Sequence, residues 1–417
     1  MFRTNFLAAR LRSRLAVFMI LLGVIALLPT TAWASGSLAS CDPNHVFHFG
    51  RFWLVLPTGS DDTSNIQCAF DHAATERGST LLLTAGTYNT GQIAVFNFVG
   101  TFRGLGTNDT IIKTLDRTLN VAPLDFFVNP PTPENGSNPW PSIFAFVGGD
   151  VVISDLSFYS TPNVWTTGWT WAELGTTVYE LAHAFVVVGP VVPGQAYTEA
   201  NAALHRVRIE GVAQDGTLFG YDPISAIYYE GFYGAPYGQT LPLRGKFEAR
   251  DSEFTHVAGG TNLFNLDGSR ASITHNRFAD SFEGMDLGAA TNTVYEFADN
   301  QVLDNSAWGL NLWGPFSSTT LLIKNDVVTG TGMGLYLDDT VTFAGDMKCR
   351  LLKNAVENVS DVGIYLGQGV TDCLVVCKSR LDTVKNLGAD NQLVGCHPVT
   401  AGETEKGGVR SRLHRIP

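Results

Sequence analysis

The hydrophobic positions in the second half of the chain recur with a period of about 25 residues. One phrase of glycine, an aliphatic residue, a variable residue and leucine starts at Gly284, Gly309, Gly334 and Gly363, and Gly388 continues the spacing. A second phrase keeps step with it, and its central residues are Ser252, Asn276, Asn300, Asn325, Asn354 and Ser379. Two markers locked in phase predict a repeat architecture.

Each repeat contains short β-branched and aliphatic runs in which hydrophobic and polar residues alternate, broken by Gly, Asn, Asp and Ser. No helical period of ten or more residues lies between them, which argues against βαβ units. We therefore predict an all-β, single-stranded parallel β-helix with one coil per repeat. Asn276, Asn300, Asn325 and Asn354 are predicted to form a stacked turn ladder, because asparagine tolerates left-handed backbone geometry.

Earlier coils are present but interrupted by long insertions. The segments 151–158 and 203–211 match the strand beside the asparagine column, and 183–189 and 226–231 match the glycine phrase. The insertions contain Trp165, Trp169 and Trp171, the segment 214–223, and Phe232, Tyr233 and Tyr237. Long aromatic loops beside a cleft are often functional, although they could instead pack on each other.

The segment "DDTSNIQCAFDHAATERGSTLLLTAGTYNTGQI", Asp61 to Ile93, resembles the N-terminal cap of the pectate-lyase-like superfamily, with Thr84 in place of the usual proline of P-x-G-x-Y. Ile66, Phe70 and Ala73 line one face of the expected helix, which would plug the open end of the β-helix. The resemblance covers roughly residues 55–396 and implies a right-handed parallel β-helix. It also implies a broad range of activities, among them polysaccharide lyases, glycoside hydrolases, esterases, tailspikes and epimerases.

The first 34 residues resemble a secretory signal peptide, with four arginines, an apolar run from Leu15 to Leu28, and the small-x-small site "AWA". We expect a β-helix domain over 35–396, a flexible tail over 397–417, and export to the medium, periplasm or cell surface. Removal of four arginines and no acid would change the net charge from −12 to −16. That charge argues against nucleic acid and anionic membranes as partners. Neutral glycans, or anionic glycans bridged by a cation, stay open, as does the choice between a monomer and a homo-oligomer.

The chain contains six cysteines, which an exported protein can use as disulfides. Cys41 and Cys68 lie near the N-terminal edge and are predicted to pair. Cys373 and Cys377 are four positions apart, which makes them candidate zinc ligands, although no second ligand pair is near them in sequence.

Strand alternation assigns the outward side chains of the sheet that carries the glycine phrase. The expected stripe is Tyr228 and Glu230, Asn265 and Asp267, Asp286, Asn311 and Trp313, Tyr336 and Asp338, then Tyr365. Carboxylates, amides and aromatic rings are the groups from which sugar sites are built. An ordinary polar exterior would have the same composition.

Glu230 and Asp267 are predicted to lie on neighbouring coils about 5 Å apart, with Asp286 on the next coil. These three are the candidate catalytic residues, and Asp267 and Asp286 are also possible calcium ligands. No other cofactor is indicated. The candidate substrate-binding residues are Tyr228, Asn265, Asn311, Trp313, Tyr336, Asp338, Trp169, Trp171 and Tyr233.

The sharper signatures of the superfamily are absent from the sequence. The polygalacturonase set N-T-D, D-D, G-H-G and R-I-K is missing, and the arginine or lysine base of the lyases has no counterpart on the stripe; Arg244, Lys246 and Arg270 lie near its edge. We expect a secreted polysaccharide-binding protein that is a candidate glycoside hydrolase or polysaccharide lyase. The alternative is a non-catalytic carbohydrate-binding, adhesion or surface scaffold.

Overall fold

The computed structural model describes residues 41–115, 142–161, 184–189, 199–212, 225–234, 239–378 and 383–399, without the side chains of 232–234 and 239–241. The expected signal peptide, Trp169, Trp171, the insertion 214–223 and most of the expected tail lie outside these residues. Tyr233 lies in the short strand β13 (Phe232–Gly234), which pairs antiparallel with β14 (Gln239–Leu241).

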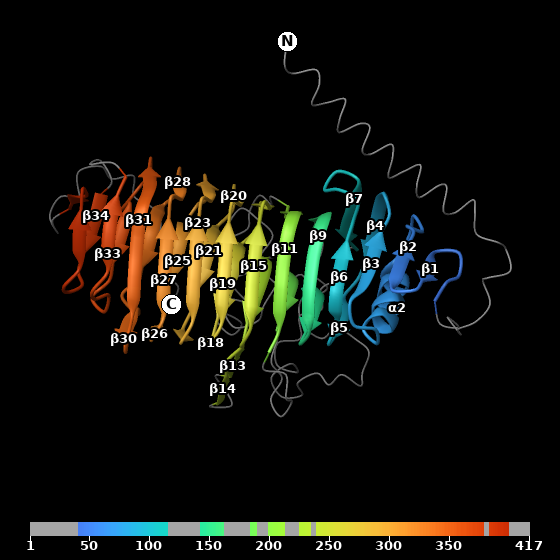
Figure 1. Cartoon of the computed structure of the whole chain (residues 1–417). Coiled ribbons are helices and arrows are strands. Elements are labelled where there is room, and N and C mark those ends of the chain that lie inside the picture. Colours follow the sequence, from blue (N-terminus) through green and yellow to red (C-terminus); the bar gives the residue numbers. More distant parts are fainter. Residues whose placement is uncertain are drawn as a thin grey trace, which may run out of the picture. The chain divides into compact units, whose positions relative to one another are not determined.

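One sheet holds eleven strands, each paired in parallel with the strand of the next coil (Figure 1). In chain order they are β5 (Ile93–Phe96), β8 (Ser142–Val147), β10 (Ala184–Val188), β12 (Ser225–Glu230), β17 (Gly259–Phe264), β21 (Glu283–Leu287), β25 (Trp308–Leu312), β29 (Met333–Leu337), β32 (Ile364–Leu366), β34 (Thr383–Asn386) and β36 (His397–Pro398). The glycine phrase belongs to this sheet, as predicted.

A larger sheet of 19 strands bends around the rest of each coil. Its strands are β1 (Val46–Phe49), β2 (Phe52–Val55), β3 (Ser79–Leu83), β4 (Gly86–Thr90), β6 (Val99–Arg103), β7 (Thr110–Thr114), β9 (Asp150–Tyr159), β11 (Asn201–Glu210), β15 (Lys246–Arg250), β16 (Glu253–Thr255), β19 (Arg270–Thr274), β20 (Arg277–Ala279), β23 (Val294–Ala298), β24 (Gln301–Leu303), β27 (Thr320–Lys324), β28 (Val327–Thr329), β31 (Lys348–Glu357), β33 (Leu374–Cys377) and β35 (Gln392–Val394). The long strands β9, β11 and β31 each pair with two shorter strands on neighbouring coils.

A third sheet has four short strands, β18 (Leu266–Asp267), β22 (Ala290–Thr291), β26 (Pro315–Ser317) and β30 (Thr342–Ala344). Apart from the hairpins β1–β2 and β13–β14, the strands pair in parallel from coil to coil. The predicted parallel β-helix is therefore confirmed by the strand ladders of the chain itself.

The predicted asparagine ladder lies where the chain turns within the larger sheet, for example between β19 and β20. The Asn276 amide oxygen accepts from the backbone N–H of Ser252, and the Asn300 amide oxygen accepts from that of Asn276, both at 3.0 Å. Asn354 continues the ladder, but the residue before it is Asp326 rather than the predicted Asn325. The step from Asn300 to Asp326 is 26 residues instead of the predicted 25, so Asn325 takes the left-handed turn position with φ 57°.

The recurring glycine faces the core at a point where two coils approach closely. A Cβ on Gly284 would lie 2.6 Å from the carbonyl oxygen of Gly309, and one on Gly309 would lie 2.8 Å from that of Gly334. Such distances are too short for any side chain, and the next residues inward, Met285 and Leu310, fill the core. Glycine recurs at this position because each of these coils makes the same close contact with the next coil.

The predicted helix is confirmed as α2 (Thr63–Ala73), which lies beside the first coils in Figure 1. Its Phe70 ring is fully buried and packs edge-on against rings of two successive coils, Phe102 of β6 at 5.0 Å and Phe146 of β8 at 5.8 Å. The apolar face of α2 thus adds to the core of the first coils.

The disulfides correct one prediction and confirm another. Cys373 bonds to Cys349 and Cys377 bonds to Cys396, so the zinc interpretation of the Cys373–Cys377 spacing is wrong. Cys41 and Cys68 are both disulfide-bonded and no free cysteine is found, which leaves them as partners, as predicted. Disulfides persist in oxidising compartments. Within the described residues, no helix has the length and apolar character needed to cross a membrane.

Candidate functional site

The outer face of the eleven-stranded sheet carries one continuous column of outward side chains. Strand register places these residues side by side on successive coils: Ala94, Ala145, Val187, Tyr228, Asn262, Asp286, Asn311, Tyr336, Tyr365 and Lys385. The column is apolar and buried as far as Val187, and polar or aromatic from Tyr228 onward. The candidate site therefore begins at β12.

A second outward column runs beside the first. Glu230 of β12 pairs with Phe264 of β17, and Gly288, Trp313 and Asp338 follow on the next three coils. The rings of Phe264 and Trp313 approach to 5.3 Å across Gly288, where a Cβ would lie within 3 Å of both. Glycine at this position lets the two rings meet.

The predicted register is wrong in one coil. The strand of that coil is β17, in which Gly260, Asn262 and Leu263 take the positions of the glycine phrase, so Asn262 and Phe264 stand where Asn265 and Asp267 were expected. The sequence does contain a marker of the correct register. Gly260 precedes Gly284 by 24 residues, the same spacing that separates Asn276 from Asn300.

Asn265 and Asp267 lie beyond the end of β17. Asn265 occupies a left-handed turn with φ 51°, and Asp267 belongs to β18 of the four-stranded sheet. Asp267 pairs with Arg244 at 2.8 Å, and this hydrogen bond lowers the pKa of the Asp267 carboxyl. Strand register therefore does not place Asp267 beside Glu230, and a catalytic role for either residue stays a prediction.

Two carboxylates of β21 lie on the outer face, Asp286 and Glu283. Both point outward because the two residues between them, Gly284 and Met285, both face the core. Strict alternation of inward and outward residues would place Glu283 on the opposite face from Asp286, so the sequence pattern did not indicate Glu283 as a site residue. Its position directly before the repeating glycine is the signal that could have found it.

The environment of this pair favours the neutral acid. Burial raises the pKa of Asp286 to about 7, and the side chain is only 9% exposed. Burial, and then the neighbouring charge of Asp286, raises the pKa of Glu283 well above its usual range. Two interacting carboxyls that both resist ionisation titrate as a pair, which favours retention of at least one proton on the pair near neutral pH.

Hydrogen bonds hold Asp286 in place and partly offset its burial. The Asn311 amide nitrogen donates to the Asp286 Oδ1 at 3.1 Å, and the Trp313 indole donates to the same carboxyl. Both bonds lower the pKa of Asp286, because they favour the charged form. The Asn311 amide oxygen is itself buried and has no hydrogen-bond partner among the described residues. An unpaired buried oxygen of this kind is a place for a donor from a ligand or water.

Tyr228 lies two coils before Asp286 in the same column. Burial and then the charge of Glu230 raise the pKa of the Tyr228 hydroxyl, and the charges of Glu283 and Asp286 add to the effect. Tyr228, Glu230, Glu283 and Asp286 therefore share one electrostatic environment, three of whose members were predicted as site residues.

Two groups of aromatic rings flank the carboxylate pair. On one side, Tyr228 packs edge-on against Phe264 at 5.5 Å, and Phe264 contacts Trp313. On the other, Trp308 stacks with Tyr336 at 6.2 Å, and Tyr336 lies 4.9 Å from Tyr365. Rings in this arrangement can contact the apolar faces of sugars.

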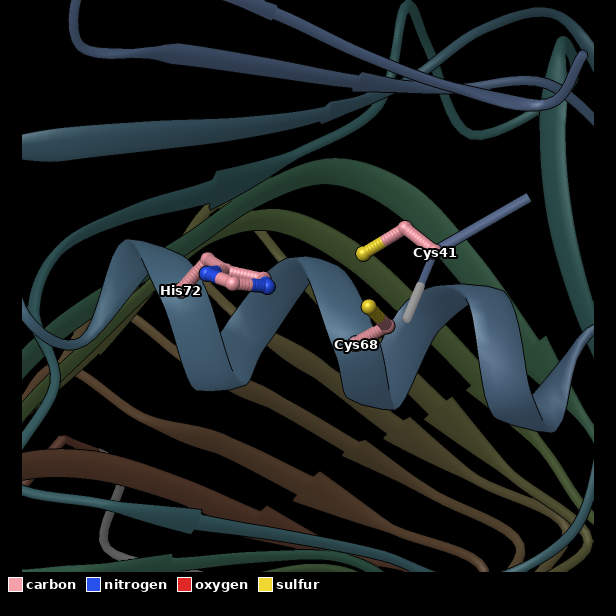
Figure 2. Close-up of side chains that lie close together, drawn as sticks. All are labelled: Cys41, Cys68 and His72. Atoms are coloured by element: carbon pink, nitrogen blue, oxygen red, sulfur yellow. The ribbon is translucent and has the colours of Figure 1, made fainter. Parts of the chain in front are cut away.

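No calcium cage is evident among the described residues. Asp267 and Asp286 lie in different sheets, and the only three His, Cys, Asp or Glu ligand atoms gathered there, within 4.8 Å, belong to Cys41, Cys68 and His72. Figure 2 shows these three side chains at α2. Both cysteines are oxidised, and a disulfide offers no thiolate to a metal.

No model of a known protein family matches the sequence, and a search among curated proteins gives no match. Among solved structures, the enzymatically active domain of tailspike protein 2 of bacteriophage CBA120 is 10% identical, and the match covers 82% of this chain and 45% of that domain with a TM-score of 0.47. The chain thus spans about half of that domain.

Polygalacturonase from Erwinia carotovora ssp. carotovora is 12% identical, covering 83% of this chain and 96% of the enzyme with a TM-score of 0.43. The A-module of a mannuronan C-5 epimerase of Azotobacter vinelandii is 13% identical, covering 82% and 95% with a TM-score of 0.32. Likenesses this distant carry nothing about activity. The chain is a parallel β-helix protein, as its own strand ladders establish and as its resemblance to the pectate-lyase-like superfamily implied.

Proposed function

We propose that the outer face of the eleven-stranded sheet binds a polysaccharide, and that Glu283 and Asp286 act as an acid/base pair in its cleavage. The observation that carries this proposal is the position of two adjacent carboxylates between two groups of aromatic rings. A flat parallel sheet presents side chains every ~4.8 Å, a spacing suited to an extended polymer.

The proposed acid/base chemistry follows from the protonation of Glu283 and Asp286. Cleavage of a glycosidic bond needs one carboxylic acid to protonate the leaving oxygen and a second carboxylate to act as base or nucleophile. A carboxyl whose pKa is about 7, as for Asp286, still holds its proton in a large fraction of molecules at neutral pH. A pair that retains one proton supplies both forms at once.

Hydrolysis is favoured over β-elimination by the residues on the face. The lyase mechanism suggested by the family resemblance needs an arginine or lysine base. In strands β12 to β32, none of the outward positions named above is lysine or arginine. Arg244, one of the basic residues expected near the edge, pairs with Asp267 in another sheet.

The test is an activity survey of the protein on soluble polysaccharides. Reducing-end formation reports hydrolysis, ultraviolet absorption of unsaturated products reports elimination, and glycan-array binding reports recognition without turnover. Asp286→Asn and Glu283→Gln should each lower hydrolysis by at least about 100-fold, the usual contribution of a general acid or base. Binding of the same glycan should persist, because both substitutions conserve shape.

The controls change carboxylates elsewhere on the coil. Asp299 lies in a turn of the larger sheet and Glu248 lies in β15 of the same sheet. The variants Asp299→Asn and Glu248→Gln should therefore keep full activity. Asp267→Asn and Glu230→Gln decide between the site predicted from sequence and the site proposed from the structure. Hydrolysis that survives in both Asp286→Asn and Glu283→Gln would end the acid/base proposal. Binding with no turnover of any glycan by the unmodified protein would favour the non-catalytic scaffold.

A further inference from the structure

The proposed glycan face carries acidic groups and almost no basic ones. Asp338 adds its charge to the surroundings of Asp286, and Asp338, Asp339 and Asp361 all act on Tyr336. The one cation found at the described part of the face is Lys385, whose ammonium lies 5.2 Å from the ring centroid of Tyr365 at the far end of the column. Lys385 is five coils beyond Asn262 by strand register.

The sequence around the face is equally free of basic residues. Residues 118–205 contain no lysine or arginine, and neither do residues 209–243. These segments lead into and out of strands β8, β10 and β12. No lysine or arginine from them can therefore balance the carboxylates of the face, wherever the intervening residues lie.

Three basic residues of the neighbouring sheets are paired with carboxylates. Arg244 pairs with Asp267 at 2.8 Å, Arg277 with Glu253 at 2.9 Å, and Lys324 with Glu296 at 2.9 Å. These pairs connect residues of adjacent coils away from the eleven-stranded sheet. They leave the negative charge of the glycan face uncompensated.

From this charge distribution we infer that the face takes an uncharged polysaccharide and rejects polyuronates and sulfated glycans. The inference rests on the proposed function and specifies its substrate class. A uronate bound between the aromatic groups would bring a carboxylate close to Asp338 and to the partly ionised Asp286, and both would repel its charge. A neutral sugar meets no such penalty, and its hydroxyls can donate to the carboxylates and to the unpaired Asn311 amide oxygen.

The experiment compares each neutral glycan with a negatively charged derivative of the same backbone. Soluble neutral glucans, galactans, mannans and xylans are each paired with their own carboxymethylated derivative, and affinities for the full chain are measured at low and high salt, in EDTA and in calcium. We expect the neutral member to bind at least tenfold more tightly at low salt. The difference should shrink at high salt, because exposed charges are screened.

Charge-removing variants sharpen the result. The double variant Asp339→Asn, Asp361→Asn should bind the carboxymethylated glycan several-fold more tightly than the unmodified protein does, with the affinity for the neutral glycan unchanged. Asp280→Asn, on a turn of the larger sheet, is the matched control and should change neither affinity.

The outcomes separate this inference from the proposed function. Equal or tighter binding of the anionic member, with or without calcium, overturns the inference and leaves glycan binding by the face intact. Binding of the neutral glycan that Tyr336→Ala and Asn311→Ala leave unchanged, or no binding of any glycan, overturns the proposed function and this inference with it.

Discussion

Asn311 donates a hydrogen bond of 3.1 Å to the Oδ1 of Asp286, its register partner on the preceding coil. The bond favours the charged form of Asp286 against the burial that raises its pKa to about 7. Asn311→Ala removes the bond and should raise the pKa of Asp286 by about one unit further.

The measurement is the titration of the Asp286 carboxyl by NMR, together with the upper limb of the pH–rate profile once a substrate is known. Both should move to higher pH. Asn292→Gly is the control, because it removes the matching hydrogen bond to Asp267 in another sheet and should leave the Asp286 titration unchanged. An unchanged or lowered Asp286 pKa in Asn311→Ala would contradict the electrostatic description of the site.

Ionisation of the Glu283 carboxyl should lower the free energy of unfolding of the protein above about pH 5. Its pKa in the folded chain lies above the unfolded value, so the folded state resists ionisation. The contribution of Glu283 to the free energy of unfolding is therefore highest below about pH 4 and falls as the pH rises toward the folded pKa. Glu283→Gln removes that loss, and we expect its melting temperature at pH 8 to exceed that of the unmodified protein by a few degrees.

The same comparison at pH 4 should show little difference, because both chains then carry a neutral side chain at this position. Glu248→Gln on β15 is the control for the substitution itself. A Glu283→Gln chain that is less stable at pH 8 would show that Glu283 is held as a favourable charge, contrary to its assignment to a proton-sharing pair.

Asp326 stands in the ladder where the other coils carry asparagine. Its Oδ1 accepts from the backbone and side-chain nitrogens of Asn300 at 2.7 Å and 3.0 Å, but its buried Oδ2 has no partner in the part of the chain that the structure describes. Neighbouring asparagines use the equivalent nitrogen to donate to a carbonyl, as Asn300 does to Ile273. Burial raises the pKa of Asp326 to about 7, so ionisation in the folded chain is costly.

Asp326→Asn restores the missing donor and should stabilise the protein at pH 8 by up to roughly 4 kcal/mol, the free energy equivalent of the shift in pKa. The gain should fall toward pH 4, where Asp326 is neutral. Urea unfolding at both pH values measures it, with Asp299→Asn on the exposed turn as the control. A gain of the same size at pH 4 and pH 8 would rule out ionisation as its cause.

Gly309→Ala should destabilise the coil by about 1–3 kcal/mol, the usual cost of overpacking a core. Its Cβ would lie 2.5 Å from the Val328 Cγ1 and 2.8 Å from the Gly334 carbonyl oxygen. Gly268→Asn is the control, since Gly268 has φ +66° with nothing within 4 Å, and asparagine tolerates that conformation. Equal melting temperatures for Gly309→Ala and the unmodified protein would contradict the close approach of the two coils.

Much of the site could be predicted because the coil repeats its chemistry. Asp286, Asn311, Tyr336 and Tyr365 were placed in one column by the glycine phrase alone, and register confirms that column. The coil of β17 was misplaced because threonine stands where the phrase has an aliphatic residue, while the leucine of "LFNLD" imitates it three residues later. A shift of three residues changes every outward side chain of a strand.

The fold follows from the repeat in the amino-acid sequence, since parallel stacking requires the same residue type at the same place in each turn, as with the glycine that cannot accept a Cβ. The place of Glu283 beside Asp286, and that of Asp326 instead of Asn325 in the ladder, emerge only once the chain is folded. Both depend on local departures from the repeat, two successive inward residues in one case and one added residue in the other. The sequence period predicts the features that all coils share. Glu283 and Asp326 lie where one coil differs from its neighbours, so the period did not predict them.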